Sequence, residues 1–184
     1  MHIAQNHAVR TSVTDPLQVN WLETPPEWRV GLTFAPGKRG PSTKGARWER
    51  DLDSDLEVLV RKGIRTIASL VEADELVEWG ITELPSAAAA RGIELLHRPI
   101  QDVSVPTVSD ARSIVRELIA RRSAPIIIHC IGGLGRTGVI AGCLLRALDV
   151  APDEALRRLV ATRGKRCPET PEQRRFVTNF SLNA

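Results

Sequence analysis

The part of the chain with the clearest chemistry is one segment, residues 125–138, which reads PIIIHCIGGLGRTG. His129 and Cys130 end an apolar run, and five residues separate Cys130 from Arg136. The residues between them are rich in glycine, so the backbone can curl and turn its N–H groups toward a common point. A thiol, a row of N–H groups and a guanidinium then share one small volume, which suits a tetrahedral dianion such as phosphate.

The elements on either side of this segment would position those groups. Residues 126–128 are three consecutive isoleucines, a pattern typical of a short strand buried on both faces. Residues 136–147 carry apolar side chains at helical spacing, which predicts a helix packed beside that strand. A strand–turn–helix unit directs its turn at the helix N-terminus, where unpaired N–H groups and the positive end of the dipole favour an anion.

These groups define a reaction class. The positive field of the loop stabilises the thiolate of Cys130, which can attack phosphorus and form a cysteinyl-phosphate that water then cleaves. Arg136 can hold two phosphoryl oxygens in a planar fork, a geometry that lysine cannot provide. The predicted phosphate-binding loop consists of Ile131, Gly132, Gly133, Leu134, Gly135 and Arg136.

A leaving alkoxide or phenoxide needs a proton, so the reaction also requires a carboxylic acid nearby. Asp102 follows a predicted strand at residues 93–98 and therefore falls on a loop at a sheet end. Asp110 begins a helical pattern and is better explained as a first-turn charge that complements the helix dipole. We therefore assign the role of general acid to Asp102.

Two side chains next to the nucleophile have alternative interpretations. His129 precedes Cys130 in an extended strand, so its side chain points the other way and would orient the loop rather than act as a base. Thr137 fits a plain helix-start residue, but its hydroxyl also lies where it can donate to the Cys130 sulfur and ease its departure.

A second motif overlaps the first. Residues 133–138 read GLGRTG and fit the G-x-G-x-x-G pattern of dinucleotide-binding folds. That pattern requires a second strand that ends in an acidic residue about twenty positions further on. Asp153 lies at this distance, but it begins a helical pattern, so the dinucleotide interpretation is excluded.

At this point the sequence resembles a known family. The pattern His129-Cys130-x5-Arg136-Thr137 is the signature of cysteine-dependent protein tyrosine and dual-specificity phosphatases. The surrounding residues, with Pro99-Ile100-x-Asp102 and Ala35-Pro36-Gly37, resemble the kinase-associated phosphatase branch, which dephosphorylates a cyclin-dependent kinase in animals. The resemblance runs from about residue 30 to the C-terminus. It implies metal-independent hydrolysis of phosphate monoesters without a cofactor.

The resemblance also implies roles for individual residues. Cys130 would be the nucleophile, Arg136 the phosphate clamp, Asp102 the general acid and Thr137 the helper of the leaving thiolate. Gln173 resembles the water-positioning glutamine of the family. Its place three residues after Thr170, with Pro171 between them, equally fits a helix-capping box. The two roles of Gln173 do not exclude each other.

The pattern along the chain predicts an α/β fold of the protein tyrosine phosphatase type. We expect a single domain at residues 26–184, with a mostly parallel central sheet and helices on both faces. Residues 1–25 are polar and weakly periodic, which predicts an N-terminal arm. Residues 36–45 are rich in proline, glycine and lysine, so we expect a loop there.

Composition defines the setting. The chain has 184 residues, a net charge of +3 and three cysteines without a C-x-x-C pair, which favours the reducing cytoplasm. Neither a membrane-spanning run nor an apolar leader is found, and aromatic residues are too sparse for a nucleic-acid surface. We expect a monomer, although the sequence does not define the oligomeric state. Cys143 is predicted to lie in the core and Cys167 to be a surface thiol, with the alternative that Cys167 shields Cys130 as a disulfide partner.

The loop interior, residues 131–135, carries no lysine. Lipid-directed members of the family that the chain resembles often have lysines there, so the resemblance implies a phosphorylated protein rather than a lipid phosphate as substrate. The choice between phosphotyrosine and phosphoserine or phosphothreonine depends on loop heights that the sequence does not define. Three alternatives remain: a phospho-binding module with weak turnover, a phosphatase that acts on a non-protein phosphate, and a sulfur-transfer or arsenate-reducing enzyme, which also uses a cysteine in an anion loop.

Overall fold

The computed structural model describes residues 9–24, 28–41 and 45–183. A central sheet of five strands has the order β2-β3-β8-β6-β7, and a second, three-stranded sheet has the order β1-β5-β4. The elements are β1 (Val9–Arg10), β2 (Asn20–Leu22), β3 (Val30–Phe34), β4 (Arg39–Pro41), β5 (Arg47–Glu49), α1 (Leu52–Arg61), β6 (Thr66–Ser69), α2 (Ala73–Glu78), α3 (Leu84–Ala89), β7 (Glu94–His97), α4 (Val108–Ile119), β8 (Ile126–Cys130), α5 (Gly135–Ala147), α6 (Pro152–Arg163) and α7 (Pro171–Asn179).

The central sheet is built around β8, the strand of consecutive isoleucines, which is buried along its whole length. Strands β3, β6 and β7 run parallel to it directly or through a neighbour, and β2 pairs antiparallel with β3 at the edge. The sheet is therefore mixed, with a parallel majority as predicted. Because Phe34 pairs with Cys130 and Ser69 with His129, the carboxyl ends of three strands meet at one edge.

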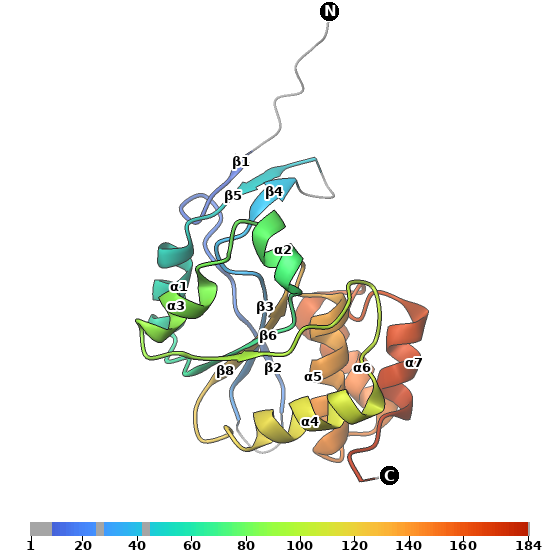
Figure 1. The fold of residues 1–184 in the computed structure, drawn as a ribbon. Helices are drawn as coiled ribbons and strands as arrows, with labels where there is room; N and C mark the ends of the chain where they lie inside the picture. The colour runs from blue at the N-terminus through green and yellow to red at the C-terminus, as the bar shows by residue number, and fades with distance from the viewer. Residues whose placement is uncertain (1–8, 25–27, 42–44, 184) are drawn as a thin grey trace, which may run out of the picture.

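Helices cover both faces of the central sheet, as expected (Figure 1). Helices α4, α5 and α6 pack on the face that carries Ile126 and Ile128. Helices α1 and α3 pack on the opposite face, where Ile127 lies. The alternation of β8 side chains between two apolar layers explains why this strand reads as a continuous apolar run. Among the described residues, no helix is both long and apolar enough to span a bilayer.

The second sheet was not predicted. Strand β4 lies inside the expected loop at residues 36–45 and pairs antiparallel with β5, while β1 pairs parallel with β5 (Figure 1). Strands of two or three residues with glycine and proline give no periodic signal, and here cross-strand pairing outweighs local propensity. Residues 42–44 of the expected loop lie outside the described residues.

Part of the expected N-terminal arm is packed against the domain. Strand β2 lies within it, and Leu17 and Leu22 are buried in the two apolar layers. Residues 1–8 and 25 of the expected arm lie outside the described residues.

The loop after β3 is fixed by a buried ion pair. Arg50 donates to both carboxylate oxygens of Asp55, at 2.7 and 2.8 Å, and neither side chain is exposed by more than 1%. The same carboxylate accepts the backbone N–H of Gly37 at 2.8 Å. Both oxygens of the buried Asp55 carboxylate therefore accept hydrogen bonds, which compensates the cost of burying its charge. Through its bond to Gly37, this carboxylate holds the next residue, Lys38, close to the carboxyl edge of the central sheet.

Candidate active site

Cys130 is the last residue of β8 and is 3% exposed. It lies in a pocket of about 540 Å³ to which several separate segments contribute. The N–H of Gly133 donates to the Cys130 sulfur across 3.3 Å. Helix α5 begins at Gly135, so the loop between strand and helix curls around the thiol. This is the strand–turn–helix arrangement that the sequence predicts.

Gly133 is required by the shape of the loop. Its φ is +70°, and a Cβ at this position would lie 2.2 Å from the carbonyl oxygen of Thr33. The loop therefore packs directly on the β3 backbone, which only glycine permits. Gly132 differs, because a Cβ there would meet nothing within 4 Å.

Arg136 lies in the first turn of α5 and is 2% exposed. Its two terminal nitrogens donate to the two carboxylate oxygens of Glu75, at 2.6 and 2.8 Å, and one also donates to the carbonyl of Ile100 at 3.0 Å. Burial alone would lower the pKa of Arg136, but hydrogen bonding to Glu75 and the charges of Cys130 and Asp102 raise it above the ordinary value. The guanidinium is therefore a permanent cation in a fixed plane.

The third nitrogen of Arg136 has no partner within the described part of the chain. Its Nε is buried and has no hydrogen-bond partner among the described residues. A buried N–H without a partner is costly, and a phosphoryl oxygen would satisfy it.

Asp102 lies over the guanidinium. Its Oδ1 is 2.9 Å from Nη2 of Arg136, and its side chain is 64% exposed. The carboxylate lines the same pocket as Cys130. The backbone N–H of Asp102 donates to Glu72 at 3.3 Å, which ties the acid loop to the start of α2.

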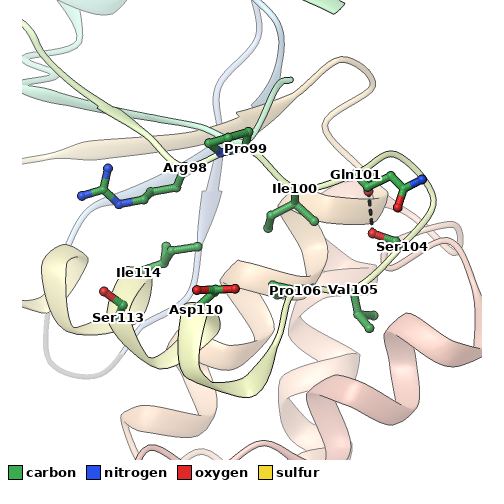
Figure 2. A pocket seen from close by; sticks show the side chains of 10 residues that line it. All are labelled: Arg98, Pro99, Ile100, Gln101, Ser104, Val105, Pro106, Asp110, Ser113 and Ile114. Atoms are coloured by element: carbon green, nitrogen blue, oxygen red, sulfur yellow. Dashed lines mark hydrogen bonds between the residues drawn. The ribbon is translucent and has the colours of Figure 1, made fainter. Parts of the chain in front are cut away.

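Asp110, the rival acid, lies elsewhere. It sits in the first turn of α4, where the hydroxyl of the N-cap residue Thr107 accepts its N–H at 3.1 Å. It lines a separate pocket of about 490 Å³. Figure 2 shows this pocket between α4 and the loop that carries Gln101 and Ser104. The structure thus brings Asp102, and not Asp110, to the pocket of Cys130.

Three charged residues at the site were missed by sequence reasoning: Glu75, Lys38 and Arg163. Lys38 is 5% exposed, and its ammonium donates to the carbonyl of Ile131 at 3.1 Å. Arg163, the last residue of α6, donates to the carbonyls of Gly133 and Gly132 at 2.9 and 3.2 Å. Glu75 had one local signal, the capping box that it forms with Glu72, but that signal predicts a helix start and no contact with Arg136.

Lys38 is surrounded by aromatic rings. Its ammonium lies 4.4 Å from the ring centroid of Trp48, 4.6 Å from that of Phe34 and 5.9 Å from that of Trp79. Cation–π attraction of this kind holds an ammonium in a defined place. Burial lowers the pKa of Lys38 to about 8, although the nearby Cys130 opposes this shift.

Thr137 and His129 lie beside the nucleophile without hydrogen-bonding it. Both are fully buried, and neither the Thr137 hydroxyl nor either His129 ring nitrogen has a partner among the described residues. Burial lowers the pKa of His129 to about 4, so the imidazole is neutral at physiological pH. His129 follows the strand alternation and lies on the face of β8 opposite Cys130.

Gln173 forms the predicted capping box at the start of α7. Its side-chain oxygen accepts the N–H groups of Thr170 and Glu169, at 3.2 and 3.1 Å, and its amide nitrogen donates to the carbonyl of Ser104 at 3.1 Å. The same amide lies close to the phosphate loop, since a Cβ on Gly135 would be 3.0 Å from its nitrogen. Gln173 therefore joins α7, the acid loop and the phosphate loop.

The two other cysteines are buried. Cys143 lies in the core, as predicted. Cys167 was expected at the surface, but it is fully buried and donates to the carbonyl of Leu134 at 3.3 Å. The expectation was wrong because the basic residues around Cys167 in the sequence turn outward while its thiol packs under the loop. Burial raises the pKa of Cys167 to about 12.

Comparisons with known proteins agree with this geometry. A family model described as "Polymorphic toxin system, DSP-PTPase phosphatase" matches residues 44–148, more than half of the chain. Cyclin-dependent kinase inhibitor 3 of Sus scrofa is 30% identical over 175 residues, which cover 90% of this chain and 79% of that protein. The protein of the same name from Rattus norvegicus is 29% identical with the same coverage.

Solved structures give the same result. Kinase associated phosphatase, crystallised with its catalytic site cysteine replaced by serine, superposes with a TM-score of 0.79 at 28% identity, over 88% of this chain and 92% of that one. Tk-PTP in its active form gives a TM-score of 0.69 at 25% identity, over 90% and 97%. The resemblance inferred from the sequence is thereby confirmed, and the chain belongs to the DSP-PTPase family of dual-specificity protein phosphatases.

Proposed function

We propose that this phosphatase hydrolyses phosphate monoesters on the side chains of proteins, with Cys130 as nucleophile. The observation that carries the proposal is the position of the Cys130 sulfur, which accepts the N–H of Gly133 in a pocket flanked by the Arg136–Asp102 ion pair. A thiolate, an anion cradle and an acid within one pocket are the components that in-line displacement at phosphorus requires.

The reaction balances in two steps. First the Cys130 sulfur bonds to phosphorus, the ester P–O bond breaks, and the carboxylic acid of Asp102 transfers its proton to the leaving oxygen. Water then bonds to phosphorus, the S–P bond breaks, and the Asp102 carboxylate takes up a proton from the water. Arg136 would support both steps, because Glu75 fixes its plane and its Nε–H, which has no partner among the described residues, would donate to a phosphoryl oxygen. The amide of Gln173 lies next to the loop, where it could orient that water.

A protein substrate is supported by the relatives, one of which carries the name kinase associated phosphatase. The walls of the pocket include Trp48 and Trp79, which offer apolar contact to the stem of a phosphorylated side chain. Phosphotyrosine and phosphothreonine both fit this proposal. A reducing compartment such as the cytoplasm suits the mechanism, because the nucleophile acts as a free thiolate.

The proposal is tested by hydrolysis of para-nitrophenyl phosphate and of phosphopeptides in the presence of EDTA. We expect metal-independent turnover that Cys130→Ser abolishes, and a burst of phenolate when the phosphoenzyme is trapped by rapid quench. A folded, reduced protein that binds tungstate but releases no phosphate from any substrate would instead be a phospho-binding module. Turnover of free inositol phosphates in preference to phosphopeptides would replace the protein substrate by a non-protein one.

A further inference from the structure

The outer side of the phosphate loop is held by two cations from distant elements. Lys38 donates to the carbonyl of Ile131, and Arg163 donates to the carbonyls of Gly132 and Gly133. Three consecutive carbonyls of the loop therefore each accept a charge-assisted hydrogen bond. The Ile131 carbonyl also accepts the N–H of residue 35 at 3.3 Å. The carbonyls of Gly132 and Gly133 accept their side-chain hydrogen bonds from Arg163.

Because of peptide geometry, these contacts on the outside of the loop determine the direction of the N–H groups on its inside. In a trans peptide the C=O and the following N–H lie in one plane and point in opposite directions. A carbonyl held on the outside therefore directs the next N–H to the inside. The peptide between Gly132 and Gly133 shows both halves: its carbonyl accepts from Arg163, and its N–H donates to the Cys130 sulfur. The same relation applies to the peptides that follow Ile131 and Gly133.

We propose that Lys38 and Arg163 are positioning residues that hold these three carbonyls outward and thereby aim the N–H groups of Gly132, Gly133 and Leu134 at the phosphoryl group. The proposal rests on the proposed function, because it explains what keeps the phosphate-binding N–H groups of the loop in place. Without the two donors, a peptide of this glycine-rich loop could rotate and present its carbonyl oxygen to the thiolate. That orientation repels the substrate dianion.

Both donors are themselves fixed. The ammonium of Lys38 lies among three aromatic rings, and its loop is tied to α1 through the buried Arg50–Asp55 pair. The remaining terminal nitrogen of Arg163 donates to the side-chain oxygen of Asn20 in β2 at 2.7 Å. Both donors are therefore held in place: Arg163 is anchored to the edge strand β2, and Lys38 is anchored to the second sheet. Preorganised N–H groups of this kind need no rearrangement when charge develops on the substrate.

Variants that lose the donor but keep the stem test the proposal. We expect Arg163→Met to weaken tungstate binding, measured by calorimetry, by about tenfold, because two charge-assisted hydrogen bonds are lost. Lys38→Met should weaken it by about threefold to tenfold, since residue 35 still bonds the Ile131 carbonyl. Arg163→Lys retains a single donor and should lie between wild type and Arg163→Met. The same ranking should appear in kcat/KM for a phosphopeptide.

Lys165→Met is the charge-matched control. Lys165 lines the same pocket, but its side chain makes no hydrogen bond or ion pair with another described residue. Its removal takes away one positive charge without freeing a carbonyl, so its effect should be clearly smaller than that of Lys38→Met. Equal losses in Lys165→Met, Lys38→Met and Arg163→Met would overturn the proposal, because pocket charge alone would explain them. Wild-type affinity in both Met variants would overturn it as well. If Arg163→Met does not fold, Arg163→Lys and the two Lys38 variants, to Met and to Arg, decide in the same way.

A pH profile separates positioning from packing. Tungstate affinity of the wild type should decline as pH rises through about 8, where Lys38 loses its proton. Lys38→Arg keeps its charge, so its tungstate affinity should not decline as pH rises through about 8. Lys38→Met should bind tungstate more weakly than the wild type below this pH, and its affinity should not change as pH rises through it. The charged groups that face Lys38 are Cys130, Arg50 and Arg163. Failure of the proposed function is distinct, because turnover would then survive Cys130→Ser or be absent in every variant, whereas failure of the clamp leaves Cys130-dependent turnover intact.

Discussion

The carboxylate of Asp102 and the guanidinium of Arg136 form an ion pair of 2.9 Å across the mouth of the phosphate loop. The pair has two consequences. The carboxylate competes with a phosphoryl group for the same guanidinium, and it must be neutral before it can donate a proton. Substrate binding therefore exchanges one anion for another on Arg136, and the displaced acid is left beside the leaving oxygen.

Asp102→Asn separates these two effects. We expect tungstate to bind more tightly to this variant, because the competing charge is gone. Turnover of a phosphoserine or phosphothreonine peptide should fall by about a hundredfold or more, since general acid catalysis is lost. Turnover of para-nitrophenyl phosphate should fall less, because its leaving group needs little protonation. A parallel Asp110→Asn variant is the control, and an equal loss there would show that the acid is wrongly assigned.

The two hydrogen bonds from Arg136 to Glu75 make a second prediction. Glu75→Gln keeps the shape of the side chain but removes the charge that compensates a buried cation. Truncating one partner of such a pair typically costs about 1–3 kcal/mol of stability, and we expect a loss in this range by urea unfolding. The value of kcat/KM should fall by about tenfold or more as Arg136 loses its fixed plane.

Glu78→Gln is the matched control for that variant. Glu78 is exposed on the same short helix, α2, and its substitution by glutamine removes the same charge as Glu75→Gln. Its stability and kinetics should stay close to wild type. If Glu78→Gln and Glu75→Gln behave alike, net charge on α2 rather than the contact with Arg136 is responsible.

Two adjacent glycines of the phosphate loop should respond differently to the same substitution. Gly133→Ala places a Cβ 2.2 Å from the carbonyl oxygen of Thr33 at a φ of +70°, so the loop must move away from β3 or fail to form. Gly132→Ala meets nothing within 4 Å. We expect a lower melting temperature and lost tungstate binding in the first variant, and a melting temperature near wild type in the second. Equal melting temperatures would show that the loop does not pack on β3 as described.

The sequence predicts the catalytic loop well because its chemistry is local. The strand, the turn and the helix around Cys130 and Arg136 are consecutive, and their hydrophobic periods are read directly from the chain. Asp102 was placed at the same edge because parallel strands end together. Each of these inferences needs only short-range patterns and one topological rule.

The residues that support this loop could not be found in the same way. Glu75 lies 61 positions from Arg136, Lys38 lies 93 positions from Ile131, and Arg163 lies 30 positions from Gly133. Each is an ordinary charged residue in its own segment, and only the folded chain brings it to the site. The three-stranded sheet that supports Lys38 was missed for the same reason, because strands this short are defined by their partners.

His129 should make stability depend on pH in the acidic range. Its folded pKa is about 4, below the ordinary value of 6.5, because burial disfavours the charged imidazolium. The unfolded chain therefore binds this proton more readily between these values. The stabilising effect of a neutral His129 is complete above about pH 6.5, is lost as pH falls, and levels off below about pH 4.

We expect urea unfolding of the wild type to show this decline in the free energy of unfolding between about pH 6.5 and pH 4. His129→Gln cannot titrate, so its curve should be flatter over the same interval even if its stability at neutral pH is lower. The difference between the two curves isolates His129 from the carboxylates that also titrate in acid, because those are shared by both proteins. Parallel curves across the interval would show that His129 binds its proton equally well in the folded and unfolded protein, and that its imidazole is not buried as described.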